Sequence, residues 1–176
     1  STMDMAIIHD LFTNCIEASK ILDTDEEFRS ELESARARLL PPQIGQYGQL
    51  QEWFRDFPEL EPGHRHHSHL FGLHPGRQIT MRGTPELAEA CRRSLERRFE
   101  HGAGRGGWPC AWIISFWARL EEPDPAYRQV RLLLGNSTCP NMFNGRRVYQ
   151  IDGNLSGMAG MAEMLLQSHA GEISLL

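Results

Sequence analysis

The sequence predicts a mostly helical protein, organised either as a helical bundle or as part of an α/α toroid. Apolar residues recur at steps of three and four in several segments, which is the spacing of one helix face. Long loops separate these segments, and almost no segment alternates apolar and polar residues as a strand does. The 176 residues, 40% hydrophobic and 23% charged, suffice for one domain with its own core.

Two helices are expected at the start of the chain. Ile7 and Leu11 belong to an apolar stripe that runs through residues 3–22, and the Thr2 hydroxyl can cap its first turn. Three polar residues then interrupt the stripe and can cap a second helix at about 25–40. Two prolines follow and end it.

The segment 41–83 predicts a long folded loop, with a short helix near 48–56. It is rich in glycine and proline, and its polar and aromatic residues lack a helical period. Side chains such as Trp53 and Phe71 make it too apolar for disorder. Long ordered loops often carry binding residues, so we expect functional side chains here.

Four further helices are expected. Thr84-Pro85-Glu86 combines a capping hydroxyl, a proline at the first helical position and an acid in the first turn, which predicts a helix to about residue 99. Two more follow at about 109–120 and 124–134. After a loop at 136–153, the last is expected at 155–168, with Met158, Met161, Ala162, Leu165 and Leu166 facing inward.

The charge balance argues against a general nucleic-acid binder. The net charge is −5, from 18 basic and 23 acidic residues. The local cluster of Arg92, Arg93, Arg97 and Arg98 is interpreted as a solvated helix face. No apolar run approaches the ~20 residues that span a bilayer, so no membrane partner is expected. The compartment stays unassigned: residues 1–20 do not form a signal peptide, and secretion would need a signal upstream.

The four cysteines form no Cys-x-x-Cys pair, so buried free thiols are expected rather than a zinc ribbon or a dense disulfide framework. The densest polar signal is His64-Arg65-His66-His67-Ser68-His69. Imidazoles donate and accept protons near neutral pH, and a guanidinium offers a fork of donors. The leading interpretation is a loop that contacts a polar ligand. Structural histidines and a metal site are the alternatives, although no His-Glu-x-x-His pattern is present.

Three weaker signals accompany the histidines. Asp152 and Asn154 precede a helix, where an acid can point into a cleft or simply cap the helix. Glu52 beside Trp53 is common in sugar sites and equally common on a helix surface. The glycines before Trp108 favour close packing of backbone against a helix.

These segments, taken in order, resemble the catalytic domain of glycoside hydrolase family 95, the inverting α-L-fucosidases. The matching stretches are Thr2-Met3-Asp4, Gly48-Gln49-Leu50-Gln51-Glu52-Trp53, His64-Arg65-His66, Ser68-His69-Leu70, Pro75-Gly76, Gly107-Trp108, Ala118-Arg119-Leu120, Gln150-Ile151-Asp152-Gly153-Asn154 and Ala162-Glu163-Met164-Leu165-Leu166-Gln167-Ser168. The family's fold implies an (α/α)6 toroid of the six-hairpin glycosidase type. Residues 1–176 would then be a single partial domain, the C-terminal half of that ring.

The resemblance also implies roles for individual residues. Asp152 matches the aspartate that polarises the asparagines activating the attacking water, and Arg65 and His66 match residues that hold the fucose. Asn154, Glu52 and Trp53 are counted as further substrate-binding candidates. The family's acid glutamate and its asparagine pair lie upstream of the matching segments. The chain departs from the family at Arg146, where a histidine that touches substrate is expected.

The expected function is therefore hydrolysis, with inversion, of a terminal α-L-fucosyl or α-L-galactosyl linkage in a glycan. The chain is expected to be truncated and inactive alone, and to need no cofactor. The exposed face of a half ring predicts self-association. The alternatives are a non-catalytic carbohydrate-binding remnant and a metal-binding helical protein built on the histidine cluster.

Overall fold

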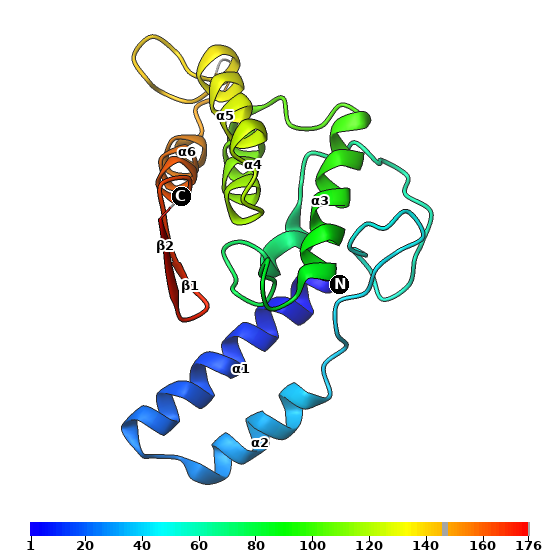
Figure 1. Cartoon of the computed structure of the whole chain (residues 1–176), viewed down its shortest axis with the longest axis vertical. Coiled ribbons are helices and arrows are strands. Elements are labelled where there is room, and N and C mark those ends of the chain that lie inside the picture. The colour runs from blue at the N-terminus through cyan, green and yellow to red at the C-terminus, as the bar shows by residue number, and fades with distance from the viewer. Residues whose placement is uncertain (146–147, 176) are drawn as a thin grey trace.

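The computed structural model describes residues 1–145 and 148–175, and the mostly helical prediction is confirmed over these ranges (Figure 1). The α-helices are α1 (Thr2–Leu22), α2 (Glu26–Ala37), α3 (Pro85–Glu100), α4 (Gly107–Arg119), α5 (Pro123–Leu132) and α6 (Ile151–Glu163). A 3-10 helix, η1 (Ser68–Gly72), and a π-helical turn, η2 (Leu133–Ser137), accompany them. The two strands, β1 (Leu166–His169) and β2 (Glu172–Leu175), form an antiparallel hairpin.

Helices α1 and α2 form an antiparallel pair that extends away from the rest of the molecule (Figure 1). Ser1, rather than the expected Thr2, caps α1: its side chain and that of Asp4 form a reciprocal capping box. The Thr2 hydroxyl instead donates to the backbone oxygen of Gln51, 2.5 Å away, and so ties the start of α1 to the long loop.

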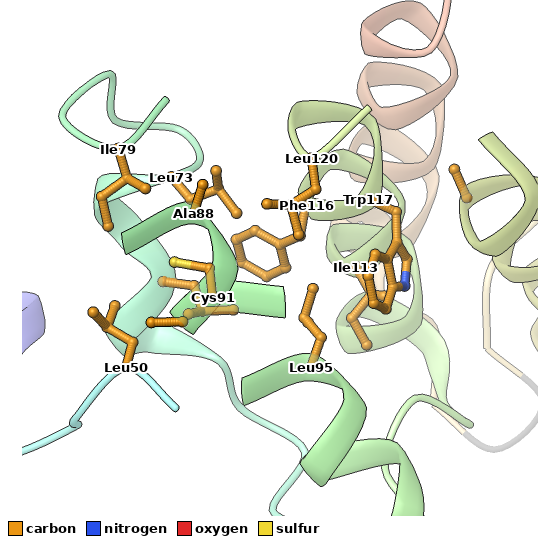
Figure 2. Close-up of a cluster of buried hydrophobic side chains, with 13 residues drawn as sticks. Leu50, Leu73, Ile79, Ala88, Cys91, Leu95, Ile113, Phe116, Trp117 and Leu120 are labelled. Atoms are coloured by element: carbon orange, nitrogen blue, oxygen red, sulfur yellow. The ribbon is translucent and has the colours of Figure 1, made fainter. Parts of the chain in front are cut away.

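The main core lies where η1 and α3 meet α4 (Figure 2). Phe116 is fully buried at its centre. The other labelled members come from the long loop and the two helices: Leu50, Leu73, Ile79, Ala88, Cys91, Leu95, Ile113, Trp117 and Leu120. The expectation of buried thiols holds for Cys91 and Cys110, whereas the free Cys15 and Cys139 are only partly buried.

Helices α4 and α6 pack closely because α6 presents glycines to its neighbours. A β-carbon at Gly160 would lie 2.8 Å from the Ile114 side chain on α4, and one at Gly157 would lie 2.7 Å from Leu133. Both glycines are buried. Small residues therefore set the spacing of the two helices.

The prediction for the last helix was wrong in its bounds and its buried face. It begins four residues earlier, at Ile151, and ends at Glu163, after which the chain forms the unpredicted hairpin. The buried face of the helix consists of glycines, so Met158 is 59% exposed. Leu165, which follows the end of the helix, is 70% exposed. Only glycine is small enough for the close contact of α6 with its neighbours. The large apolar side chain of Met158 therefore lies on the exposed side of the helix.

The short helix expected near 48–56 does not form. The backbone N–H of Leu50 donates to the Ala90 oxygen and the Ser94 hydroxyl of α3 instead. Since these backbone groups bond to another element, the segment runs along α3 as irregular structure. Among the described residues, no helix is long and apolar enough to cross a membrane.

Candidate active site

The histidine segment leads into η1 and splits into two environments. His67 and His69 are buried, at 1% and 3% exposure, whereas His64 and His66 are half-buried. Burial, helped by the positive charge of Arg98, lowers the pKa of His67 to about 3 and that of His69 well below its usual value. These two rings are neutral at pH 7 and belong to the packed interior.

His66 lies edge-on against a row of aromatic rings. Its centroid is 5.0 Å from that of His64 and 5.4 Å from that of Trp108 in the first turn of α4. Trp108 stacks in turn on Trp112, 5.5 Å away. Burial and the neighbouring Arg65 charge lower the pKa of His66, so its ring is neutral and can both donate and accept a hydrogen bond.

The first turns of α4 and α6 meet at Gly107. A β-carbon there would lie 2.8 Å from the side-chain oxygen of Gln150, the residue that precedes α6. Asp152 stands in the first turn of α6 and is exposed. Because His66 contacts Trp108, the residue after Gly107, His66 and Asp152 lie at the same end of the α4–α6 pair.

Neither Asp152 nor Asn154 caps α6, so the capping interpretation was wrong. Gln150 occupies the cap position without a side-chain bond. The Asn154 oxygen accepts from the Asn144 backbone N–H at 2.9 Å, and its amide nitrogen donates to the Met142 backbone oxygen at 2.7 Å. Asn154 thus fastens the preceding loop to the helix that carries Asp152.

Asn144, which sequence reasoning missed, fills the space between the two helix starts. Its side chain is 1% exposed, and its amide oxygen would lie 2.3 Å from a β-carbon at Gly153. The glycine that follows Asp152 is therefore required by close packing. The Gly-rich sequence before Trp108 gave a signal for such packing, but no local pattern marked Asn144.

The second group of candidates lies along α3. Glu52 accepts a hydrogen bond from Arg98 at 3.0 Å, and the neighbouring Trp53 is 51% exposed. The solvated-face prediction was wrong for Arg98, which is only 7% exposed. Arg97 pairs with Glu59 at 2.6 Å, so loop acids neutralise this face of the helix.

The structure therefore brings the predicted residues into two adjoining groups. His66 and Asp152 stand at the starts of α4 and α6, while Glu52 and Trp53 lie beside α3, with His64 between the groups. Arg65 is exposed next to them. The departure noted at Arg146 lies outside the described residues. Within those residues, no group of three or more His, Cys, Asp or Glu side chains is placed to hold a metal ion.

The first turns of α4 and α6 thus converge beside a loop that carries histidine and arginine. The model of the glycosyl hydrolase family 95 catalytic domain matches residues 1–165, and the chain belongs to this family. The whole chain is similar to Alpha-L-fucosidase 2 of Arabidopsis thaliana, with 39% identity over 188 aligned residues, which is 22% of that protein.

Two fungal proteins called Probable alpha-fucosidase A are also similar. The one from Aspergillus niger is 31% identical over 82% of this chain and 19% of its own length. The one from Aspergillus oryzae is 26% identical over 91% of this chain and 24% of its own length. The chain thus spans about a fifth to a quarter of the curated relatives it matches.

Proposed function

We propose that this chain forms part of the active site of an inverting glycosidase that removes terminal α-L-fucosyl groups from glycans. The observation that carries the proposal is the family match over residues 1–165, together with the fucosidase names of the relatives. The position of His66 and Asp152 at the same end of the α4–α6 pair supports it.

The proposed roles follow from the chemistry of each side chain. Arg65 offers several donors to sugar hydroxyls, and the neutral His66 ring offers one donor and one acceptor. Asp152 polarises the asparagine amides that activate the attacking water. An inverting glycosidase also needs an acid on the opposite side of the bond to protonate the leaving oxygen. We place that acid and the asparagines outside residues 1–176.

The domain proposal is that residues 1–176 make up about half of an (α/α)6 ring. The short share of each relative that the chain covers supports this view. Without the acid, the chain binds the sugar and does not hydrolyse it. A carbohydrate-binding protein without catalysis remains the second candidate, favoured by the exposed Arg65 and the aromatic row at His66.

The first test is release of fucose from a 2-linked fucosyl oligosaccharide by the purified chain, with circular dichroism verifying helical content. No release is expected. Fucose release at a rate proportional to protein concentration would refute the incomplete site and direct attention to Glu52 as the acid.

The second test is binding of L-fucose, followed by NMR titration. His66→Ala is expected to weaken binding about tenfold, which equals about 1.4 kcal/mol. The control is His9→Ala, which removes a half-buried histidine of α1. Equal affinities for the two variants would argue against a role of His66 in holding the sugar. Competition with L-galactose would establish whether the site accepts the extra hydroxyl.

A further inference from the structure

The chain on either side of η1 contacts the same two rings of α4. Before η1, the His66 ring lies edge-on against Trp108. After η1, His74 accepts a hydrogen bond from the indole of Trp112. Trp108 and Trp112 lie about one turn apart on α4, and their rings stack with centroids 5.5 Å apart. Two histidines from the loop are therefore connected through a pair of stacked indoles.

The backbone on both sides of His74 is fixed to α4 as well. Arg119, the last residue of that helix, donates to the Leu73 backbone oxygen at 3.3 Å and to the Gly76 backbone oxygen at 3.2 Å. Its guanidinium is only 7% exposed, so it bonds to these oxygens in a setting where water competes little. The imidazole of His74 thus approaches Trp112 from a fixed position.

The ring of His74 is in the right state to accept this bond. Its Nδ1 atom lies 3.2 Å from the indole nitrogen of Trp112. Because an indole nitrogen only donates, Nδ1 carries no hydrogen in this arrangement. Burial, helped by the Arg119 charge, lowers the pKa of His74 to about 4, so the ring is neutral at pH 7.

Packing alone leaves the two indoles room to move. One side of Trp112 packs on the buried Phe116, with ring centroids 4.9 Å apart. A cavity of about 350 Å³ lies beside the indoles, however, and Phe71 and Ala159 line it together with them. A closely packed interior fixes a ring by contact on every side. A ring beside a cavity lacks such contacts, so a directional hydrogen bond decides its orientation.

We propose that His74 is a positioning residue for the sugar site: by accepting the hydrogen bond of Trp112, it fixes the stacked indoles against which the His66 ring lies. The inference rests on the function proposed above, which gives His66 its contact with the sugar. It requires that the placement of the His66 ring depends on an acceptor at residue 74, and not on the bulk of the side chain there.

Two variants of His74 separate the hydrogen bond from the bulk of the ring. His74→Leu removes the acceptor, whereas His74→Asn keeps an acceptor oxygen near the place of Nδ1. NMR titration is expected to show L-fucose binding about fivefold weaker in His74→Leu, the effect of one typical hydrogen bond, and within about twofold of the wild type in His74→Asn. Binding by His74→Leu as tight as that by His74→Asn would overturn the proposal.

The route through Trp112 has a test of its own. Trp112→Phe keeps an aromatic ring and removes the N–H, so it should weaken L-fucose binding about as much as His74→Leu. Since both variants remove the same hydrogen bond, the double variant should bind no more weakly than either single variant. Fully additive losses of affinity would exclude this route.

His9→Leu is the matched control. It makes the same substitution at another half-buried histidine, on α1, whose pKa burial also lowers. This variant should bind L-fucose as the wild type does, and circular dichroism verifies the fold of every variant. Equal losses of affinity in His9→Leu and His74→Leu would point to a general loss of structure and refute the specific role of His74.

Signals of the sugar-free protein separate this inference from the proposed function. The indole N–H of Trp108, assigned with a Trp108→Phe variant, and the ring protons of His66 should shift in His74→Leu and stay in place in His9→Leu. These shifts, with no L-fucose binding by the wild type, would support the fixing of the rings and refute the sugar site. L-fucose binding that His74→Leu leaves unchanged would overturn the positioning role alone.

Discussion

At the scale of single residues, the most constrained group is the Arg119–Glu163 ion pair. The two side chains are joined by contacts of 2.7 and 3.3 Å, and Arg119 is only 7% exposed. Arg119 also donates to the backbone oxygens of Leu73 and Gly76. One guanidinium therefore connects the ends of α4 and α6 to the loop after η1.

Removing one partner of this pair should destabilise the protein strongly. Glu163→Gln leaves a buried guanidinium without its counter-charge, and we expect the free energy of unfolding to fall by about 3 kcal/mol. Urea denaturation measures this change. Glu17→Gln is the control, because its pair with Arg77 is exposed and should contribute less than about 1 kcal/mol. Equal losses in both variants would contradict the buried-pair argument.

His74 predicts a loss of stability in mild acid. Its Nδ1 accepts a hydrogen bond from the Trp112 indole at 3.2 Å, and burial, together with the Arg119 charge, lowers its pKa to about 4. The unfolded ring has a pKa near 6.5, so between these values the unfolded chain binds a proton that the folded chain excludes. The stabilisation is complete above pH 6.5 and is lost progressively as the pH falls toward 4.

The expected loss is about 1 kcal/mol per pH unit from this ring, and His67 and His69 add to it in the same direction. Urea denaturation at pH 7, 6 and 5 measures it. His74→Gln, which keeps a side-chain acceptor, should make the decline shallower. An unchanged slope in this variant would show that His74 contributes nothing to the acid sensitivity.

The histidine cluster, Asp152 and Arg98 show how much of the candidate site could be predicted from the sequence. The histidine cluster and Asp152 could be proposed as site residues from their residue types and order, and their roles stay predictions. The split of the cluster into buried and half-buried rings was not, since it depends on contacts with α3 and α4. Likewise, the local sequence pattern does not distinguish Arg98 from the other arginines of α3. Its burial depends on the loop that carries Glu52, its ion-pair partner.

At the scale of elements, the glycine face of α6 determines how closely it approaches α4. Gly160→Ala places a β-carbon 2.8 Å from the Ile114 side chain. We expect a loss of about 1–2 kcal/mol, because overpacking exceeds the gain in helix propensity. Met158→Ala on the exposed side of the same helix should stay within about 0.5 kcal/mol. Thermal and urea unfolding compare the two variants, and the reverse order would contradict this packing.

Most helices could be predicted from their periodicity and their proline starts, as at Pro85. The helix expected to start at Asp124-Pro125 begins one residue earlier, at Pro123, and ends at Leu132. The last helix was harder because its buried face carries glycines, which weigh little in a hydrophobic pattern. The hairpin after it is short, and its strand Leu166–His169 reads as a continuation of the helix. The structure of α6 and of the hairpin depends on contacts between residues distant in sequence, which local sequence patterns do not predict.

At the scale of the whole molecule, one side of α6 is an unpartnered apolar surface. Ile151, Leu155 and Met158 are each more than half exposed, and their spacing places them on one helix face. We expect the chain to self-associate through this face as its concentration rises, because such patches are unfavourable in water.

Sedimentation velocity over a hundredfold range of concentration tests this expectation. Leu155→Lys should shift the protein toward the monomer, whereas Tyr127→Lys, on exposed α5, should not. A wild-type protein that stays monomeric throughout the range would rule out self-association by this face. The family match predicts the ring, but whether these helices form half of it stays a prediction.

The packing of the α1–α2 pair determines where local unfolding should begin. Helix α2 packs mainly on α1, and α1 contacts the remainder chiefly at η1. Leu32 is the single α2 residue that is buried. With so little area to lose, α2 should unfold and refold many times while the core stays intact. Its amide protons should therefore exchange with solvent by local opening, at rates insensitive to mutations that weaken the main core.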